Sequence, residues 1–411
     1  MARLILTGAT GLLGRNVLFE VLKQSLRRGE RHMVVVLGRA SGDRSLRQRV
    51  MDMLSTDGAD YIFGEDRPPA IDLDALLSQV RCVEADAVGR VGDPIVQIGE
   101  LPGRARGWDA LVHCAGHTSF RTDSETARRV LDVNFGGAQR VTALAGQIEL
   151  GKLVFVGSAY SAGRMAGTIL PDDLDLAGSF ANPYQRSKAA AERVVRDFAE
   201  LSGLDTVVVR PSTIGGRLIE ERIGAVPTFA VFYEWAARML RFKIRSMGPG
   251  RPALGEWHNL PLRFHIARGA GLHIVPADYC AKLIVHAALH ATPDRAIHLA
   301  PERSTPHELY VRRMLDWIKV AGVEFVGERP ADLDRFERHY YRTLGDMFDP
   351  YVTVPAIHFD LGATRRLEQA AGIACPVVDG AAFDRLMAYA VERGLGVPEA
   401  RGDAEATVAS A

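Results

Sequence analysis

Short apolar runs alternate with longer amphipathic segments over residues 1–300 of the chain. In the longer segments apolar residues recur at every third or fourth position, which is typical of helices that pack one face on a core. The short runs are expected to be buried strands. They cover residues 2–7, 33–37, 80–85, 109–116, 152–157, 206–209 and 295–300. Strands that alternate with helices predict an α/β fold, a doubly wound parallel (Rossmann) sheet with helices on both faces.

The pattern becomes mostly helical in the last part of the chain, where Gly and Pro separate the helical segments. Residues 245–265 are rich in Gly, Pro and Arg and are predicted to form a loop. Apolar residues at helical spacing predict further helices near 306–320, 330–346, 363–371 and 380–393.

This change divides the chain into two predicted parts. Residues 1–216 and 271–300 are expected to form the larger domain around the parallel sheet. Residues 217–270 and 301–398 are expected to form a smaller, mostly helical subdomain on the substrate side. Residues 399–411 are small and polar, and this composition predicts a disordered tail.

One apolar and aromatic segment within residues 226–240 has three interpretations. Residues 229–240 have the composition of a helix, and a helix of this kind is most often part of a packed core. A second interpretation is a helix that forms one wall of an apolar substrate pocket. A third interpretation is a helix that lies on a membrane surface.

Composition excludes several classes of protein. Lys+Arg and Asp+Glu both number 50, so the formal net charge is zero and no basic surface for nucleic acid is predicted. The four cysteines form no CxxC pair and no metal-ligand spacing, so we expect reduced thiols, no bound metal and a cytoplasmic protein. The N-terminal residues lack a signal-peptide pattern, and no run is long enough to span a membrane.

A glycine-rich turn follows the first predicted strand and precedes a helical segment. Gly8, Gly11 and Gly14 have the spacing GxxGxxG. In such a turn the first glycine permits the tight bend, the second lets a pyrophosphate approach the backbone, and the third lets the helix pack on the strand. The phosphates would lie at the helix N-terminus, where free N–H groups favour anions. The turn is therefore predicted to bind a dinucleotide, through Gly8, Thr10, Gly11, Leu12, Leu13 and Gly14.

The residues at the ends of the next two strands suggest how that dinucleotide is recognised. Arg39 follows the second strand, where an arginine accommodates a 2′-phosphate and an acidic residue would bind a ribose hydroxyl. This favours NADP (NADPH) over NAD. Asp86 and Ala87 end the third strand; the aspartate is suited either to bond an adenine amino group or to cap the next helix.

Small and hydroxylated residues end the remaining strands. The small residues Cys114, Ala115 and Gly116 would let a flat cofactor lie across the sheet edge, and Pro211, Ser212 and Thr213 are suited to line a nicotinamide ring. A hydroxyl at Ser158 is placed to bond a substrate carbonyl oxygen, with Ser161 as its close competitor.

A tyrosine and a lysine lie four residues apart in the segment 182–188. Pro183 suits the start of a helix, and at that spacing Tyr184 and Lys188 project from one face of it. A lysine beside a phenol favours the phenolate, so the pKa of Tyr184 is expected to be lowered and the residue becomes a candidate proton donor.

Three other polar residues near the predicted strand ends are ambiguous. His113 and His117 have no metal-ligand partners at useful spacing and are interpreted as structural or pocket-lining. Asn134 interrupts the apolar stripe of a helix predicted over residues 124–150. It is either a satisfied core asparagine, a backbone brace for the sheet edge, or part of a water relay.

Together these motifs resemble the extended short-chain dehydrogenase/reductase superfamily over about residues 1–300. The residues that carry the resemblance are 7–14, Ser158, 184–188, 210–212 and 275–279. Within it the chain is similar to the group of fatty acyl-CoA reductases and carrier-protein thioester reductases. The similarity lies in residues 37–39, the helical insert 41–80, 113–120 and 133–137. Gly38 and the run 157–159 depart from the pattern of the group, as does the region after residue 300.

The resemblance implies an NAD(P)-dependent oxidoreductase that reduces an acyl thioester of CoA or an acyl carrier protein to an aldehyde or alcohol. It implies that Tyr184 protonates the developing oxyanion, that Lys188 holds the nicotinamide ribose, and that Ser158 orients the carbonyl. It also implies pairing of two copies as a homodimer, through helices near 124–150 and 184–203.

Two other functions stay open at this point. The first is a reductase, dehydrogenase or epimerase of a lipid, sterol-like or sugar-nucleotide substrate, although the apolar segment 226–240 suits a sugar nucleotide poorly. The second is a catalytically idle NADP-binding scaffold. The joint presence of Ser158, Tyr184 and Lys188 argues against the scaffold.

Overall fold

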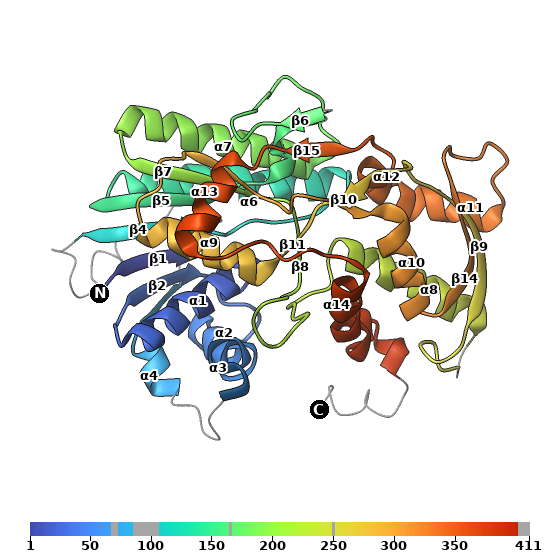
Figure 1. The fold of residues 1–411 in the computed structure, drawn as a ribbon, viewed down its shortest axis with the longest axis horizontal. Helices are drawn as coiled ribbons and strands as arrows, with labels where there is room; N and C mark the ends of the chain where they lie inside the picture. Colours follow the sequence, from blue (N-terminus) through green and yellow to red (C-terminus); the bar gives the residue numbers. More distant parts are fainter. Residues whose placement is uncertain (67–72, 85–106, 164–166, 249–250, 402–411) are drawn as a thin grey trace.

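The computed structural model describes residues 1–66, 73–84, 107–163, 167–248 and 251–401. Within these ranges seven strands form one sheet in the order β12-β7-β5-β4-β1-β2-β3, with every neighbouring pair parallel (Figure 1). Its strands are β1 (Arg3–Thr7), β2 (Met33–Gly38), β3 (Val80–Glu84), β4 (Trp108–His113), β5 (Leu150–Val156), β7 (Asp205–Pro211) and β12 (Ala296–Leu299). The strand order runs outward in both directions from β1 and β4, which confirms the predicted doubly wound sheet.

Helices cover both faces of this sheet (Figure 1). Alternate side chains of β1 point to opposite faces, so Leu4 and Leu6 join one buried cluster and Ile5 joins another. The Leu4 cluster includes side chains of α1 (Leu12–Arg28), α9 (Ala277–Leu289) and α13 (Gly362–Ala371), and the Ile5 cluster includes those of α6 (Ser124–Ala145) and α7 (Pro183–Ser202).

A group of short helices follows β2 and packs beside α1. Phe19 of α1 and Tyr61 place their ring centroids 5.8 Å apart, and both are fully buried. The group consists of α2 (Leu46–Met53), η1 (Leu54–Gly58), α3 (Ala59–Phe63) and α4 (Leu73–Leu77). It corresponds to the helical and irregular insert expected over residues 41–80.

A third buried cluster lies at one end of the sheet, and its buried members run from Leu218 to Val397. Its helical elements are α8 (Phe232–Met247), α10 (His307–Trp317), α11 (Arg335–Tyr340), η5 (Tyr341–Gly345), α12 (Asp346–Val352) and α14 (Gly380–Glu392). Short strand pairs connect this cluster to the large sheet. They are β8 (Thr213–Gly215) with β11 (Ile274–Pro276), β10 (Gly271–Leu272) with β13 (Thr305–Pro306), and β6 (Gly167–Ile169) with β15 (Ile357–Phe359).

The prediction of a loop over residues 245–265 is correct for residues 251–257, which form neither helix nor strand, and wrong at both ends of the range. Helix α8 continues to Met247, and β9 (His258–His265) is a strand parallel to β14 (Val320–Val326). In β9 the side chains of Leu260, Leu262 and Phe264 are buried and alternate with more exposed neighbours. This period of two marks a half-buried strand, and the Gly, Pro and Arg content around it obscured the signal.

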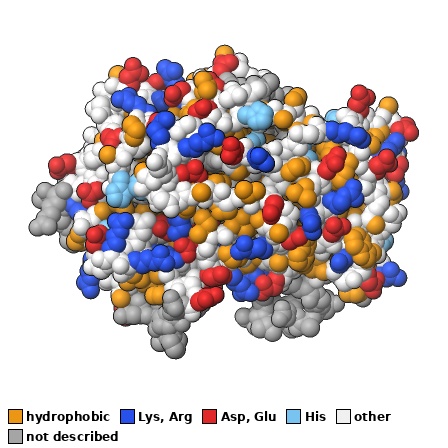
Figure 2. Space-filling view, in the orientation of Figure 1, with side chains coloured by type: hydrophobic (Ala, Val, Ile, Leu, Met, Phe, Trp, Pro, Cys, Tyr) orange, Lys and Arg blue, Asp and Glu red, His pale blue; other side chains and the backbone are white. Residues whose placement is uncertain are grey.

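The division of the chain into residues 1–216 with 271–300 and residues 217–270 with 301–398 stays a prediction. Within the last range, however, Ala363 and Leu367 of α13 pack in the cluster under the large sheet. On the face shown in Figure 2, Lys and Arg side chains are interspersed with Asp and Glu, so this face presents no area of a single charge. In the described ranges no helix has the length and apolar character needed to cross a membrane.

Candidate active site

A cavity of about 380 Å³ lies at the carboxyl ends of the central strands, where α/β sheets bind ligands. The glycine turn after β1 lines it through Gly11, Leu12, Leu13 and Gly14. Residues after the other strands also line it. These are Cys114, Gly116, Ser158, Pro211, Ser212 and Thr213, each predicted as a site residue.

The backbone of the glycine turn has the close approaches that the sequence predicts. Gly8 has a φ of +73°, and a Cβ there would lie 2.6 Å from the backbone nitrogen of Ala115. A Cβ on Gly14 would lie 2.2 Å from the carbonyl oxygen of Gly8. Only glycine fits these two positions. The absence of side chains there lets the start of α1 pack against β1. No side chain caps the first N–H groups of α1, so they are available to a ligand. This geometry fits a dinucleotide phosphate group.

Helix α7 brings Tyr184 and Lys188 into the same cavity as Ser158. The helix begins with Pro183, and the side chain of Asn182 caps it by accepting a hydrogen bond of 3.1 Å from the N–H of Gln185. The two predicted helix features, the proline start and the shared face of Tyr184 and Lys188, are therefore present.

Of the two candidate serines, Ser158 is the one at the cavity. Its hydroxyl accepts a hydrogen bond from the N–H of Tyr160 and is also hydrogen-bonded to the hydroxyl of Tyr184. Ser161 is fully buried behind it, with its Oγ 2.7 Å from the carbonyl oxygen of Ser158. Ser161 therefore supports the backbone of Ser158 from behind.

The pKa of Tyr184 differs from the sequence expectation. Burial raises the pKa of this phenol, and hydrogen bonds from the hydroxyls of Ser158 and Thr118 oppose that rise in part. The ammonium of Lys188 donates instead to the carbonyl oxygen of Val156 at 2.9 Å. Burial of the lysine holds its own pKa down at about 8, against smaller raising effects of Cys114 and Glu192.

This lowered lysine pKa predicts a pH dependence. Below about pH 8 Lys188 is protonated and can orient a bound ligand, and above it the charge is lost. We expect kcat/KM to fall as the pH rises through about 8, because this ratio reports pKa values of the free enzyme. An arginine stays charged above pH 8, so the residual kcat/KM of Lys188→Arg should not fall as the pH rises through 8. If kcat/KM fell in the same way in both proteins, the fall could not be due to Lys188.

Thr118 was missed as a site residue by sequence reasoning. It lines the cavity in the loop between β4 and α6, and its hydroxyl is hydrogen-bonded to that of Tyr184. The loop is held by Asn134, whose amide accepts from the N–H of His117 at 2.8 Å and donates to its carbonyl oxygen at 3.1 Å. The same amide donates to Ser187 of α7 at 2.9 Å. Asn134 is thus a backbone brace; no sequence pattern identifies its partner.

Several predicted cofactor residues lie beside the cavity and do not line it, among them Gly8, Thr10, Arg39 and Ala115. Near the end of β2, Arg49 donates to the carbonyl oxygen of Arg39 at 2.8 Å and to the hydroxyl of Thr10 at 3.0 Å. Burial and the nearby charges of Arg44, Arg15 and Arg39 lower the pKa of Arg49, so four guanidinium groups gather beside the glycine turn. Sequence reasoning missed Arg49 as a candidate cofactor-binding residue, because Arg49 reaches the glycine turn only through the packing of α2 beside it.

The remaining residues singled out near the strand ends are Asp86, Ala87, His113 and His117. Asp86 and Ala87 lie outside the described residues. His113 is buried, lies 2.8 Å from the hydroxyl of Thr7, and has a pKa lowered to about 3 by burial. Both His113 and His117 lie off the cavity wall. Among the described residues no group of His, Cys, Asp and Glu could hold a metal ion, and the four cysteines are free.

The far wall of the cavity is largely apolar and comes from the cluster around α8. Phe232 and Trp235 of α8 line it, while Met239 and Leu240 of the same helix lie in the core. The helix is therefore both core and pocket wall. Further apolar lining comes from Phe264, Val311, Met314, Phe348 and Val352.

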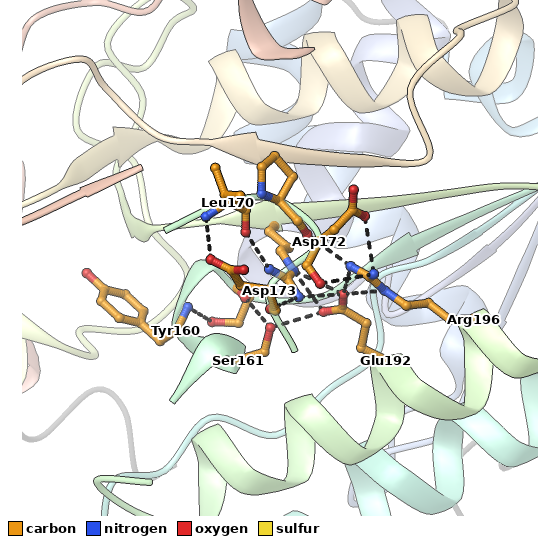
Figure 3. Close-up of polar contacts among 10 residues, drawn as sticks. Tyr160, Ser161, Leu170, Asp172, Asp173, Glu192 and Arg196 are labelled. Atoms are coloured by element: carbon orange, nitrogen blue, oxygen red, sulfur yellow. Dashed lines mark hydrogen bonds and ion pairs between the residues drawn. The ribbon is translucent and has the colours of Figure 1, made fainter. Parts of the chain in front are cut away.

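An ion network centred on Glu192 lies beside Ser161, as Figure 3 shows. The carboxylate of Glu192, one turn after Lys188 on α7, forms an ion pair of 2.7 Å with Arg210, and both side chains are fully buried. Glu192 also pairs with Arg196 at 2.6 Å and lies 3.0 Å from the hydroxyl of Ser161. Ser161 thus shares its single hydrogen between Glu192 and the carbonyl oxygen of Ser158. The network fixes the turn η4 (Ala159–Ala162) that follows Ser158.

Comparison with solved structures shows the same fold over nearly the whole chain. The terminal R domain from the myxalamid PKS-NRPS biosynthetic pathway has a TM-score of 0.66 at 20% identity, covering 96% of this chain and 92% of that one. A thiolation-reductase di-domain from an archaeal non-ribosomal peptide synthetase has a TM-score of 0.62 at 18% identity, covering 96% and 91%. A double mutant of dTDP-glucose 4,6-dehydratase from Streptomyces venezuelae, with NAD bound, has 0.62 at 18%, covering 96% and 98%.

Sequence comparison identifies the family. No curated protein sequence matches the chain. A family model described as "Male sterility protein" matches residues 6–284, which is more than half of the chain and includes the glycine turn, Ser158, Tyr184 and Lys188. The chain therefore belongs to the male sterility protein family, within the NAD(P)-dependent oxidoreductases of the extended short-chain dehydrogenase/reductase type.

Proposed function

We propose that this protein is an NADPH-dependent reductase of acyl thioesters, acting on acyl-CoA or an acyl carrier protein and giving an aldehyde or an alcohol. One observation carries the proposal: Ser158, Tyr184 and Lys188 line a single cavity that joins a glycine turn to an apolar wall. The first end suits a dinucleotide and the second an apolar acyl group, so a reacting carbonyl would lie between them.

The side chains at the junction suit reduction of a carbonyl group. A bound nicotinamide cofactor supplies the hydride. Tyr184 donates its proton to the oxygen on which negative charge develops, and Ser158 donates a hydrogen bond to the same oxygen. Both interactions strengthen as the charge forms, so they stabilise the transition state more than the ground state. Lys188 holds the nicotinamide ribose of the cofactor beside Tyr184. A thioester reduced in this way gives a hemithioacetal, which collapses to an aldehyde and a free thiol.

The gathered arginines support NADP as the cofactor. A 2′-phosphate needs cationic donors at the end of β2, where Arg39 and Arg49 lie beside Thr10. We assign the cofactor to the larger domain of residues 1–216 and 271–300, and the acyl group to residues 217–270 and 301–398.

The apolar wall favours a thioester over a sugar nucleotide. The solved relatives include both reductase domains of peptide synthetases and a sugar-nucleotide dehydratase. A sugar nucleotide carries a diphosphate, which needs cationic donors at the substrate end, and Lys188 is the one charged side chain among the described residues that line the cavity. In this chain that end is formed by Phe232, Trp235 and Met314.

The test is cofactor oxidation by the purified protein with a panel of acyl-CoAs, with free thiol measured in parallel. We expect loss of NADPH matched by release of thiol, and much slower reaction with NADH. Substitution of Arg49 by alanine should lower the ratio of the rate with NADPH to the rate with NADH. Cofactor binding without thiol release, with acyl-CoA and with a loaded carrier protein, would refute thioester reduction and favour the dehydrogenase or epimerase alternative.

A further inference from the structure

Tyr351 of α12 reaches from the C-terminal third of the chain to the catalytic helix. Its hydroxyl oxygen lies 2.7 Å from the amide nitrogen of Asn182, the capping residue of α7, and 3.3 Å from that of Gln185. Its ring lies 4.7 Å from that of Phe120, and Phe120 contacts Tyr184 in turn with centroids 5.9 Å apart. Tyr351 lines the same cavity as Tyr184, one aromatic ring away.

The orientation of both amides is fixed by the backbone. The side-chain oxygen of Asn182 accepts from the N–H of Gln185 at 3.1 Å, and the side-chain oxygen of Gln185 accepts from the N–H of Ala181 at 2.9 Å. Each amide must therefore turn its NH₂ group toward Tyr351. The phenol oxygen accepts both hydrogen bonds, and its own hydrogen has to be donated elsewhere.

No acceptor for that hydrogen exists among the protein groups in the described ranges. Tyr351 is half-buried and lines the cavity, and the hydroxyl of a tyrosine in such a place ordinarily finds a hydrogen-bond partner. The other tyrosine beside it differs: the hydroxyl of Tyr160 pairs with that of Thr213 at 3.0 Å. In the cavity this hydrogen can be donated to water when no ligand is bound, and to an acceptor group of a ligand when one is bound.

We infer that Tyr351 is a substrate-specificity residue whose hydroxyl donates a hydrogen bond to an oxygen of the thioester substrate, a few bonds from the reacting carbonyl. This inference rests on the proposed function. Two sources share the required chemistry: a hydroxyl or carbonyl oxygen on the acyl group itself, and the amide carbonyl of the pantetheine arm that carries the thiol.

The experiment measures dissociation constants by calorimetry on the full chain, with saturating NADP⁺ so that no hydride is transferred. The ligands are octanoyl-CoA, 3-hydroxyoctanoyl-CoA and the ethanethiol ester of octanoic acid, which has no further oxygen. Loss of one hydrogen bond in Tyr351→Phe should weaken the acceptor-bearing ligands about fivefold. If Tyr351→Phe weakens the binding of 3-hydroxyoctanoyl-CoA alone, the acceptor is the oxygen on the acyl group. If it weakens the binding of both CoA esters but not of the ethanethiol ester, the acceptor is the amide carbonyl of the pantetheine arm.

Tyr160→Phe is the matched control, because it removes a hydroxyl that already has a partner in the same cavity. We expect it to change all three affinities by one common factor. The inference is overturned if Tyr351→Phe also weakens all three ligands equally, which would indicate a structural role, or if it weakens none. Thiol release by the unaltered protein with NADPH is measured separately, so binding with the expected selectivity but without thiol release would refute the proposed function alone.

Discussion

Replacement of Tyr184 by phenylalanine is expected to lower kcat for thioester reduction by about 10²–10⁴-fold, the usual contribution of one positioned proton donor. The substitution removes only the hydroxyl. The ring keeps its edge-to-face contact with Phe120, and α7 keeps its proline start and asparagine cap. The loss should therefore come from chemistry and not from folding. Steady-state rates with acyl-CoA and NADPH provide the measurement.

The control for this variant is cofactor affinity. Lys188 and the glycine turn are unchanged in it, so NADPH fluorescence should report binding within a small factor of the unaltered protein. If Tyr184→Phe retained activity within tenfold, the proton would have to come from another group. Ser158 and Thr118 are the hydroxyls already hydrogen-bonded to this position, and substitution of each in turn would identify the donor.

The parallel sheet and its glycine turn were predictable because their signals are local. Short apolar runs such as residues 33–37 and 206–209 identify buried strands, and each ends within two residues of the predicted position. The turn after β1 was equally clear, since Gly8 and Gly14 occupy positions where a Cβ would collide with backbone. Pro183 marked the start of α7 by its missing N–H alone.

The rest of the site depends on contacts between distant segments. Thr118 and Tyr351 reach Tyr184 and its helix from two other elements, and nothing in their local sequence distinguishes them from surface residues. Arg49 comes beside Thr10 only because α2 folds back onto the glycine turn. The pKa of Tyr184 was misjudged for the same reason. Spacing showed that a lysine shares its face, but not that burial would have the larger effect.

Substitution of Glu192 by glutamine is expected to lower the free energy of unfolding by about 3–5 kcal/mol, the usual cost of removing one partner of a buried ion pair. Glutamine keeps the shape of the side chain, but leaves the fully buried guanidinium of Arg210 without its carboxylate. Arg210 also donates to the carbonyl oxygen of Asp173 at 2.8 Å, so the loop between β6 and α7 should loosen with it. Urea unfolding of the two proteins provides the measurement.

Asp197→Asn is the matched control for this prediction. Asp197 pairs with Arg193 at 2.8 Å on the same helix, but both side chains are about half exposed. Its loss should cost less than about 1 kcal/mol, because water screens an exposed pair. Equal losses in the two variants would show that the Glu192 network adds nothing beyond a surface pair. The network also holds Ser161 against the carbonyl oxygen of Ser158. Glu192→Gln should therefore lower kcat at temperatures where the protein is still fully folded, whereas Asp197→Asn should leave the position of Ser158, and with it the rate, unchanged.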